Sequence, residues 1–183
     1  MDIRTIRPSD EAALRALCYE TIPLRHRLEA ERFVIWQSYG QYYLDCEAAH
    51  CFVALEGDKP VGAILCAPNY ADYTRRFNER VYPKCQAYGY FAGASARQSL
   101  LMHKRLGGRY PAHMQCLWPE SRQDLALPLF EALAAHLEAL ECRGICAFPD
   151  VKKQPALCNA LSELGFEVLG KSARTLLMAK ELF

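Results

Sequence analysis

The sequence lacks the features that mark several large classes of protein. Its 183 residues carry 22 lysines and arginines against 21 aspartates and glutamates, so the formal net charge is only +1. Proteins that bind nucleic acid or an anionic membrane surface usually concentrate positive charge. There is also no apolar N-terminal signal segment and no apolar stretch near the ~18 residues that a membrane span needs. We therefore expect a soluble, cytoplasmic protein without nucleic-acid or membrane partners.

A closed metal site is also not expected. The chain has nine cysteines but no CxxC pair, although Cys142 and Cys146 are four residues apart and Cys46, His50 and Cys51 are clustered. Structural zinc sites usually contain one or two such pairs. Because the cysteines lie singly within apolar runs, we interpret them as buried, reduced thiols. The sequence predicts no metal ligand.

Length and composition indicate one domain that spans residues 1–183. About half of the residues, 51%, are hydrophobic, which is enough to form a full-sized core at this length. No linker, repeat or low-complexity segment divides the chain.

The first half of the chain predicts strands, helices and one glycine-rich segment. Val61 follows a Gly57-Asp58 turn, which is typical of a hairpin. The expected elements are a strand at 3–7 and a following helix, a helix from Leu24 to about Glu47 that Gly40 divides, hairpin strands at 50–56 and 61–67, a helix from Tyr70 to about Ala87 broken near Pro83, and mobile loop within 88–108, which holds four glycines.

The second half is more regular and completes an α/β pattern. It predicts strands at 112–118 and 144–148, helices at 128–140 and 155–164, and two closing strands in FEVLG and ARTLLMAKEL. The order predicts an α/β fold with a mixed sheet of about six to seven strands flanked by helices.

One junction has no glycine where many α/β enzymes keep a phosphate loop. In PESRQDLALPLFEAL, a helix capped by Ser121 and Asp124 would place Pro128 in its interior, at a cost of roughly 3 kcal/mol. At the first helical position the missing N–H costs nothing. We therefore expect a loop up to Leu127 and a helix from Pro128, with backbone N–H groups and the helix dipole directed toward a possible anion.

With that junction in place, the chain resembles the GNAT acetyltransferase superfamily. The resemblance rests on IRTIRPSDEAALRAL, CFVALEGDKPVGAILCAPN and ALSELGFEVLG in this order, and it covers nearly the whole chain. The segment from YLDCEAAH to RYPAHMQCLWPE is similar to a bacterial branch related to the acetyltransferase-like domain of O-GlcNAc hydrolases, which is regarded as lacking transferase activity. The resemblance implies a GNAT-like sheet that splays between the strands at 112–118 and 144–148.

The resemblance also implies that acetyl-CoA is the cofactor, and it indicates which residues would contact it. In the superfamily the loop reads Arg/Gln-x-x-Gly-x-Gly/Ala, and here both glycine positions are leucine. A bulky residue hinders close approach of the backbone to phosphate, and an aspartate in the loop repels it. We therefore expect weak acetyl-CoA binding. The implied contacts are Cys116, Leu117, Trp118, Arg122, Gln123, Asp124, Leu125, Ala126 and Leu127, with Gln154 on the pantetheine arm unless it is an ordinary exposed residue.

For catalysis, an amine acyltransferase needs a base near the splayed strand. His113 and Glu120 flank that strand, and a histidine has a suitable unperturbed pKa. His113 as a structural histidine and Glu120 as a solvated turn carboxylate remain alternatives. The superfamily often has a tyrosine that protonates the departing thiolate, and Leu161 stands at that position.

Two further candidates come from neighbouring side chains. Cys116, His113 and Asp150 could form a thiol triad, although residues three apart on a strand face opposite sides. An aromatic group could line an acceptor pocket, by resemblance to the superfamily, or could form a core stripe at helical spacing; its members are Trp36, Tyr39, Tyr42 and Tyr43. Tyr42 is the best candidate for the pocket, because Tyr39 and Tyr43 already share the stripe.

Three functions therefore remain open. The first is a GNAT-like protein with weak or absent acetyl-CoA-dependent transfer. The second is an active N-acyltransferase for a small-molecule or protein amine, and the third is a non-catalytic binding or assembly module, for which a homodimer is possible.

Overall fold

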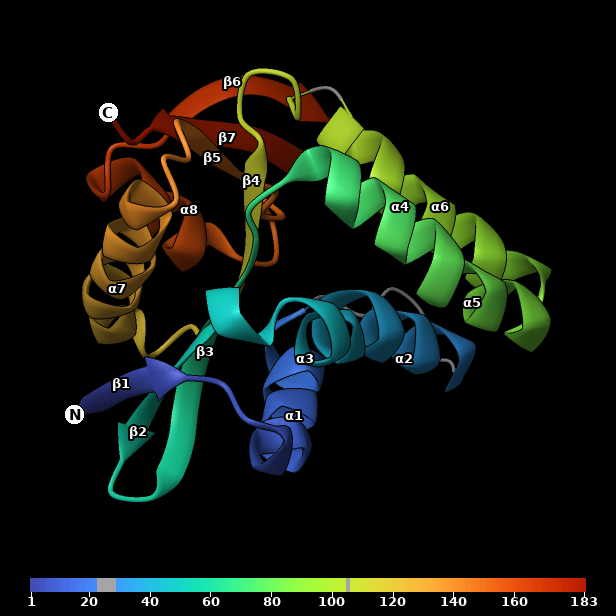
Figure 1. The fold of residues 1–183 in the computed structure, drawn as a ribbon, viewed down its shortest axis with the longest axis horizontal. Coiled ribbons are helices and arrows are strands. Elements are labelled where there is room, and N and C mark those ends of the chain that lie inside the picture. The colour runs from blue at the N-terminus through green and yellow to red at the C-terminus, as the bar shows by residue number, and fades with distance from the viewer. Residues whose placement is uncertain (23–28, 105) are drawn as a thin grey trace.

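A seven-stranded sheet lies between two layers of helices (Figure 1). The structure is a computed structural model that describes residues 1–22, 29–104 and 106–183. The strands are β1 (Asp2–Thr5), β2 (Phe52–Glu56), β3 (Lys59–Ala67), β4 (Ala112–Leu117), β5 (Gly144–Ala147), β6 (Glu167–Ser172) and β7 (Thr175–Glu181), in the spatial order β1-β2-β3-β4-β5-β7-β6. The predicted α/β class and the number of strands are confirmed.

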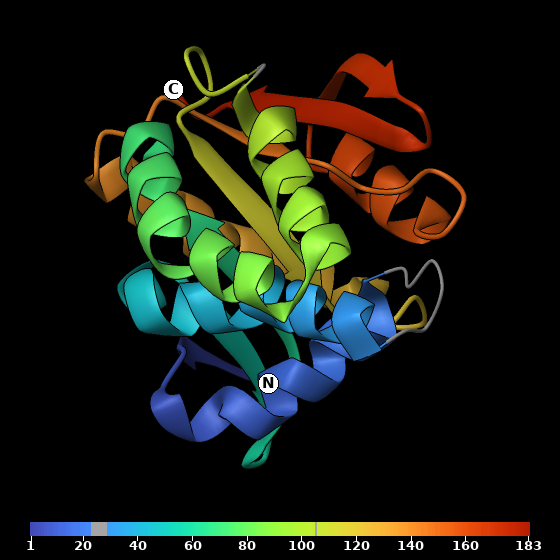
Figure 2. The same ribbon diagram turned by 90° about the vertical axis from the view of Figure 1, so that its right-hand side faces the viewer.

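The helices are divided unequally between the two faces of the sheet (Figures 1 and 2). Among the described residues, six α-helices cover one face and two cover the other, and each face has its own cluster of buried side chains. The six are α1 (Glu11–Thr21), α2 (Glu29–Trp36), α3 (Tyr42–Cys46), α4 (Tyr70–Arg80), α5 (Tyr82–Tyr88) and α6 (Tyr90–Lys104); the two are α7 (Ala126–Ala139) and α8 (Pro155–Glu163).

The sheet opens between its two central strands. β4 and β5 run parallel and pair only at Ala112 with Ile145 and at His113 with Cys146, whereas the other neighbouring strands are antiparallel. Beyond His113, β4 continues to Leu117 beside β3 alone. The predicted splay between these two strands is confirmed, and it creates space at the carboxyl end of β5.

The hairpin of β2 and β3 follows the sequence prediction closely. Gly57 has a φ of +60°, which a glycine adopts without strain, so the chain reverses where Gly57-Asp58 was expected to turn it. The helix expected to break near Pro83 is likewise two helices, α4 and α5, with Pro83 in the first turn of α5.

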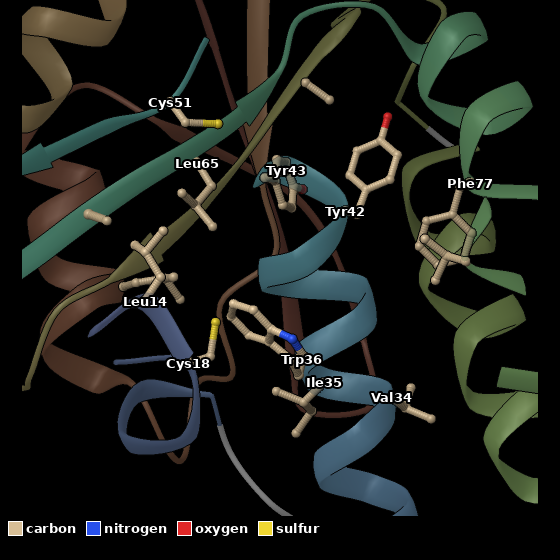
Figure 3. Packing of buried hydrophobic residues seen from close by; sticks show 14 of the residues in the cluster. Leu14, Cys18, Val34, Ile35, Trp36, Tyr42, Tyr43, Cys51, Leu65 and Phe77 are labelled. Carbon is tan, nitrogen blue, oxygen red and sulfur yellow. The ribbon is translucent and has the colours of Figure 1, made fainter. Parts of the chain in front are cut away.

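A continuous helical segment extends from α2 to α3, and Gly40 does not break it. Between them, Gln37–Gln41 forms a π-helical turn, η2. A Cβ at residue 40 would lie 2.2 Å from Cζ3 of Trp36, so only glycine leaves room for this indole within the core (Figure 3). The predicted start of this helix, Leu24, lies outside the described residues.

The prediction of a mobile loop within 88–108 is wrong, because most of this segment is helix α6. Its Gly93 packs against α5, where an added Cβ would lie 3.3 Å from Cα of Gln86. The glycine therefore permits close contact between two helices instead of ending one. Within the described residues, no helix is long and apolar enough to cross a membrane.

Candidate functional site

The splay between β4 and β5 holds a cavity of about 630 Å³. Its floor is β4, and α2, η2, α4 and α6 form one wall. The opposite wall is the end of β5 with the following loop, the start of α8, and the β6–β7 turn. A cavity of this size and place is typical of a small-molecule site.

A second cavity of about 250 Å³ adjoins the first on the side of α8. The two share Cys116, Gln154 and Leu157 as lining residues. The smaller cavity also touches Trp118 at the end of β4, and Glu120 and Gln123 of the junction that leads into α7. The two cavities therefore lie next to each other between β4 and the start of α8.

His113 lies in the floor of the large cavity and is almost fully buried. Its Nε2 is 2.8 Å from the hydroxyl oxygen of Tyr43, and the ring of Tyr73 lies edge-on to the imidazole, with centroids 4.2 Å apart. The imidazole is thus held in place by α3 and α4. This position suits either a base or a structural histidine, so its catalytic role stays a prediction.

Glu120 and the proposed thiol triad are placed differently. Glu120 is exposed and lines only the smaller cavity. Cys116, His113 and Asp150 all line the large cavity, but Nε2 of His113 contacts Tyr43. Burial raises the pKa of the Cys116 thiol, which disfavours the thiolate that a nucleophile requires.

The junction expected to hold pyrophosphate is occupied by an internal ion network. The Arg122 guanidinium donates to both carboxylate oxygens of Asp124 at 2.9 Å and to Glu56 Oε1 of β2 at 2.7 Å. One positive charge therefore faces two negative charges. The hydrogen bond from Arg122 also holds the pKa of the Asp124 carboxyl below its usual value, so this carboxyl is ionised at neutral pH.

Backbone donors of the junction are also in use. The N–H groups of Arg122, Leu125 and Ala126 donate to the carbonyls of Pro119, Arg122 and Gln123, respectively, which forms a 3-10 turn, η4 (Gln123–Leu125). An anion would need these groups to be directed toward it. The guanidinium of Arg122 and these three amides are therefore already bonded within the junction.

Helix α7 begins at Ala126, two residues before the predicted start at Pro128. Pro128 is then the third helical residue, where its missing N–H still lacks an intrahelical acceptor. The side chain of Leu125 is wholly buried against Trp118 and Gly62 of β3, whereas Leu127 is 54% exposed. The Leu125 side chain is therefore part of the core, and the roles of Leu125, Ala126 and Leu127 in cofactor binding stay predictions.

The remaining cofactor candidates surround the smaller cavity or lie beneath it. Trp118 is buried, and its Nε1 donates to Gln123 Oε1 at 3.3 Å. Cys116 lines both cavities, but Leu117 is fully buried in the core on the other face of the sheet. Gln154 precedes α8, where its Nε2 donates to the Thr21 carbonyl at 3.2 Å and its Oε1 accepts from the Asp150 amide. It is therefore partly buried between α1 and α8 instead of being an ordinary exposed side chain.

Several solved structures resemble this fold over nearly the full length of the chain. SsHAT matches with a TM-score of 0.84 and 17% identity over 100% of this chain and 98% of its own. A Drosophila melanogaster polyamine N-acetyltransferase matches with a TM-score of 0.65 and 14% identity over 98% and 99%. The PaiA N-acetyltransferase of Thermoplasma acidophilum, solved with coenzyme A, matches with a TM-score of 0.61 and 12% identity over 98% of each chain.

The fold is that of the GNAT N-acetyltransferases. At 12–17% sequence identity, this similarity establishes only the fold of the chain. No protein-family model matches the sequence, and no curated protein sequence matches it.

Within this GNAT fold, the position that the resemblance assigns to a proton-donating tyrosine lies in the core. Leu161 of α8 is fully buried among apolar side chains of the two-helix face. It has no proton to donate. Leu157, one turn earlier in the same helix, lines the large cavity.

Sequence reasoning missed several residues of the large cavity and misplaced one. Tyr42 does not face the cavity; it is buried, and its hydroxyl donates to Glu47 at 2.7 Å. Of the predicted aromatic group, Tyr39 of the π-helical turn lines the cavity, whereas Tyr73 and Phe148, which also line it, were missed. Arg174 of the β6–β7 turn was also missed. No local pattern distinguishes these residues, because they meet only after the sheet has formed.

Proposed function

We propose that this GNAT-like protein binds a small molecule in the cavity between β4 and β5 and transfers acetyl groups from acetyl-CoA weakly or not at all. The ion network of Arg122 with Asp124 and Glu56 carries this proposal. Two unit charges about 4 Å apart repel by roughly 1 kcal/mol in water and about 4 kcal/mol at an effective dielectric constant of 20. A pyrophosphate would meet two such carboxylates while their counter-ion is already occupied.

Calorimetry with acetyl-CoA tests the proposal directly. We expect the unmodified protein to bind with a Kd well above the micromolar range, which corresponds to about −8 kcal/mol. Tight binding would overturn the proposal. Because the relevant obstacle is charge, the double variant Glu56→Gln, Asp124→Asn should bind at least tenfold more tightly than the unmodified protein.

A matched control separates this local effect from a change in overall charge. Glu138 is exposed near the end of α7, far along the helix from the junction. Glu138→Gln should therefore leave acetyl-CoA affinity unchanged. If the double variant binds no better than this control, the ion network does not explain weak binding.

The second candidate is an active N-acyltransferase with a non-standard way of holding its cofactor. It is favoured by the adjacency of the two cavities, which share Cys116, Gln154 and Leu157 as lining residues. A screen of small amines and peptides with acetyl-CoA tests it. Robust turnover by the unmodified protein would support this candidate. If His113→Ala abolishes this turnover and Tyr43→Phe reduces it less, His113 is the base.

A further inference from the structure

The β6–β7 turn brings a positive charge to the edge of the large cavity. Ser172, Ala173, Arg174 and Thr175 all line it. Among the described residues of the lining, Arg174 is the single lysine or arginine; Glu31 and Asp150 carry the two carboxylates, and the remainder are aromatic, apolar or neutral polar. Arg174 is half-exposed, so its guanidinium is accessible from the cavity mouth.

This turn is held tightly against the segment that follows β5. The Val151 amide donates to the Arg174 carbonyl at 2.8 Å, and the Leu176 amide donates to the Pro149 carbonyl at 3.0 Å. A bridge between Asp150 and Thr175 lies between these two bonds. Arg174 therefore projects from a fixed backbone, unlike an arginine on a free surface loop.

A fixed carboxylate orients the guanidinium. Asp150 Oδ1 accepts from the amides of Lys152 and Lys153 at 2.9 and 3.1 Å, and its Oδ2 lies 3.3 Å from Arg174 Nη2. Within the described residues this ion pair is the one polar contact of the Arg174 side chain. An arginine has five N–H donors in a planar fork, so several remain for a second acceptor.

Backbone strain occurs at the same place. Ala173 has a φ of +53°, a left-handed conformation that costs a non-glycine residue roughly 1–2 kcal/mol. Strain of this kind persists where the surrounding structure enforces it, and it is concentrated at functional sites. Here it sets the direction from which the next residue, Arg174, meets the cavity.

We propose that Arg174 binds the carboxylate group of a small-molecule ligand whose apolar or aromatic body fills the cavity. The planar guanidinium matches a carboxylate in a two-bond geometry, and the hydroxyls of Ser172 and Thr175 supply donors beside it. The body of the ligand packs against Val34, Ile35 and Phe148. The proposal rests on the cavity and does not require acetyl-CoA.

Ligand-observed NMR titration with matched fragments tests it. The panel consists of aryl-alkanoic acids from phenylacetate to 4-phenylbutyrate, their primary amides, the corresponding amines, and phenyl phosphate. We expect the acids to bind the unmodified protein at least tenfold more tightly than their amides. Arg174→Gln should remove this preference, and Arg174→Lys should retain part of it, because charge remains while the fork is lost.

Two further variants make the result specific. Lys171→Gln removes an exposed positive charge of β6 outside the cavity lining and should leave the preference intact. Asp150→Asn keeps an acceptor for the two loop amides but removes the competing charge, so the acids should bind it more tightly. Melting temperatures of all variants verify that each is folded.

Several outcomes would overturn the proposal. They are equal binding of acids and amides, a preference that survives Arg174→Gln, tighter binding of the amines or of phenyl phosphate, and no binding by any member of the panel. Because no arm contains acetyl-CoA, failure here leaves the calorimetric test of the proposed function unaffected.

Discussion

Two leucines of the same junction have opposite environments, and sequence alone treats them alike. Leu125 is fully buried, and a Cβ on the facing Gly62 would lie 2.7 Å from its Cδ1, whereas Leu127 is exposed. Leucine stands at both glycine positions of the superfamily pattern, but the sequence alone did not predict which of the two leucines enters the core. That depends on Gly62, which is more than sixty residues earlier.

Substitution of the two leucines should separate their roles. Leu125→Ala removes buried methyl groups and leaves a cavity, so we expect a loss of about 2–5 kcal/mol in the free energy of unfolding, measured by urea denaturation. Leu127→Ala should stay within about 0.5 kcal/mol of the unmodified protein. Equal losses would show that the two side chains share one environment.

Ala173 provides a second test at the residue scale. Ala173→Gly relieves the left-handed strain but raises the entropy of the unfolded chain, so the net gain in unfolding free energy should be about 0.5–1 kcal/mol. Gly57→Ala is the matched reverse change, because Gly57 has a φ of +60° and no heavy atom within 4 Å of an added Cβ. It should lose about 1 kcal/mol. The same sign for both variants would contradict this account.

At the scale of elements, the π-helical turn links core packing to the cavity. Gly40→Ala places a methyl group against the Trp36 ring, so we expect a loss of about 1–3 kcal/mol in unfolding free energy. Because Tyr39 of this turn lines the cavity, ligand affinity should fall as well. Urea denaturation and a fragment titration measure the two effects.

Gly170→Ala is the control for that prediction. Gly170 lies in β6, and no heavy atom lies within 4 Å of an added Cβ. Its substitution should change unfolding free energy by less than about 0.5 kcal/mol. A similar loss for both variants would mean that steric contact with Trp36 is not the cause.

Elements with local signals were predicted well, and those that depend on packing were not. Gly57 and Pro83 act through the φ angles and hydrogen bonds of their own segments, so the β2–β3 hairpin and the α4–α5 break were correct. Gly93 acts through a neighbouring helix, and α6 was therefore mistaken for a loop. The sequence alone does not distinguish a glycine that permits close helix packing from a glycine that ends a helix.

At the scale of the whole molecule, stability should depend on pH through a pair of histidines. His50 Nδ1 lies 2.8 Å from His136 Nε2 and joins the segment before β2 to α7. Burial first, and then the charges of His136 and Arg76, lower the pKa of His50 below its ordinary value of 6.5. The unfolded chain therefore binds this proton before the native protein does.

The sign follows from this difference in proton binding. Unfolding free energy should fall as pH drops below about 6.5, with a slope well under the ~1.4 kcal/mol per pH unit of one full proton, because His50 is partly exposed. Urea denaturation at pH 7.5, 6.5 and 5.5 measures it. His50→Gln should flatten the profile, and His136→Gln should flatten it in part. Parallel profiles for all three proteins would exclude the pair as the source.

The candidate site could be predicted only as far as its location. The sequence pattern predicted the β4 strand and a junction without glycine after it, and the resemblance to the GNAT superfamily implied the splay between β4 and β5. The cavity itself combines residues from α2, α4, α6, β4 and the β6–β7 turn, which lie up to about 140 positions apart along the chain. The ion pair of Arg174 with Asp150 could not be inferred, because neither residue has a sequence pattern that points to the other.

The short contact between β4 and β5 has a mechanical consequence. Within the described residues, two residue pairs join β1–β4 to β5–β7 in the sheet. The cavity lies beside this short contact, and its lining includes residues of both halves of the sheet. A bound molecule that touches both halves would act as a brace. Hydrogen exchange at Ile145 and Cys146 should therefore slow when the cavity is filled, even though these amides do not touch the ligand.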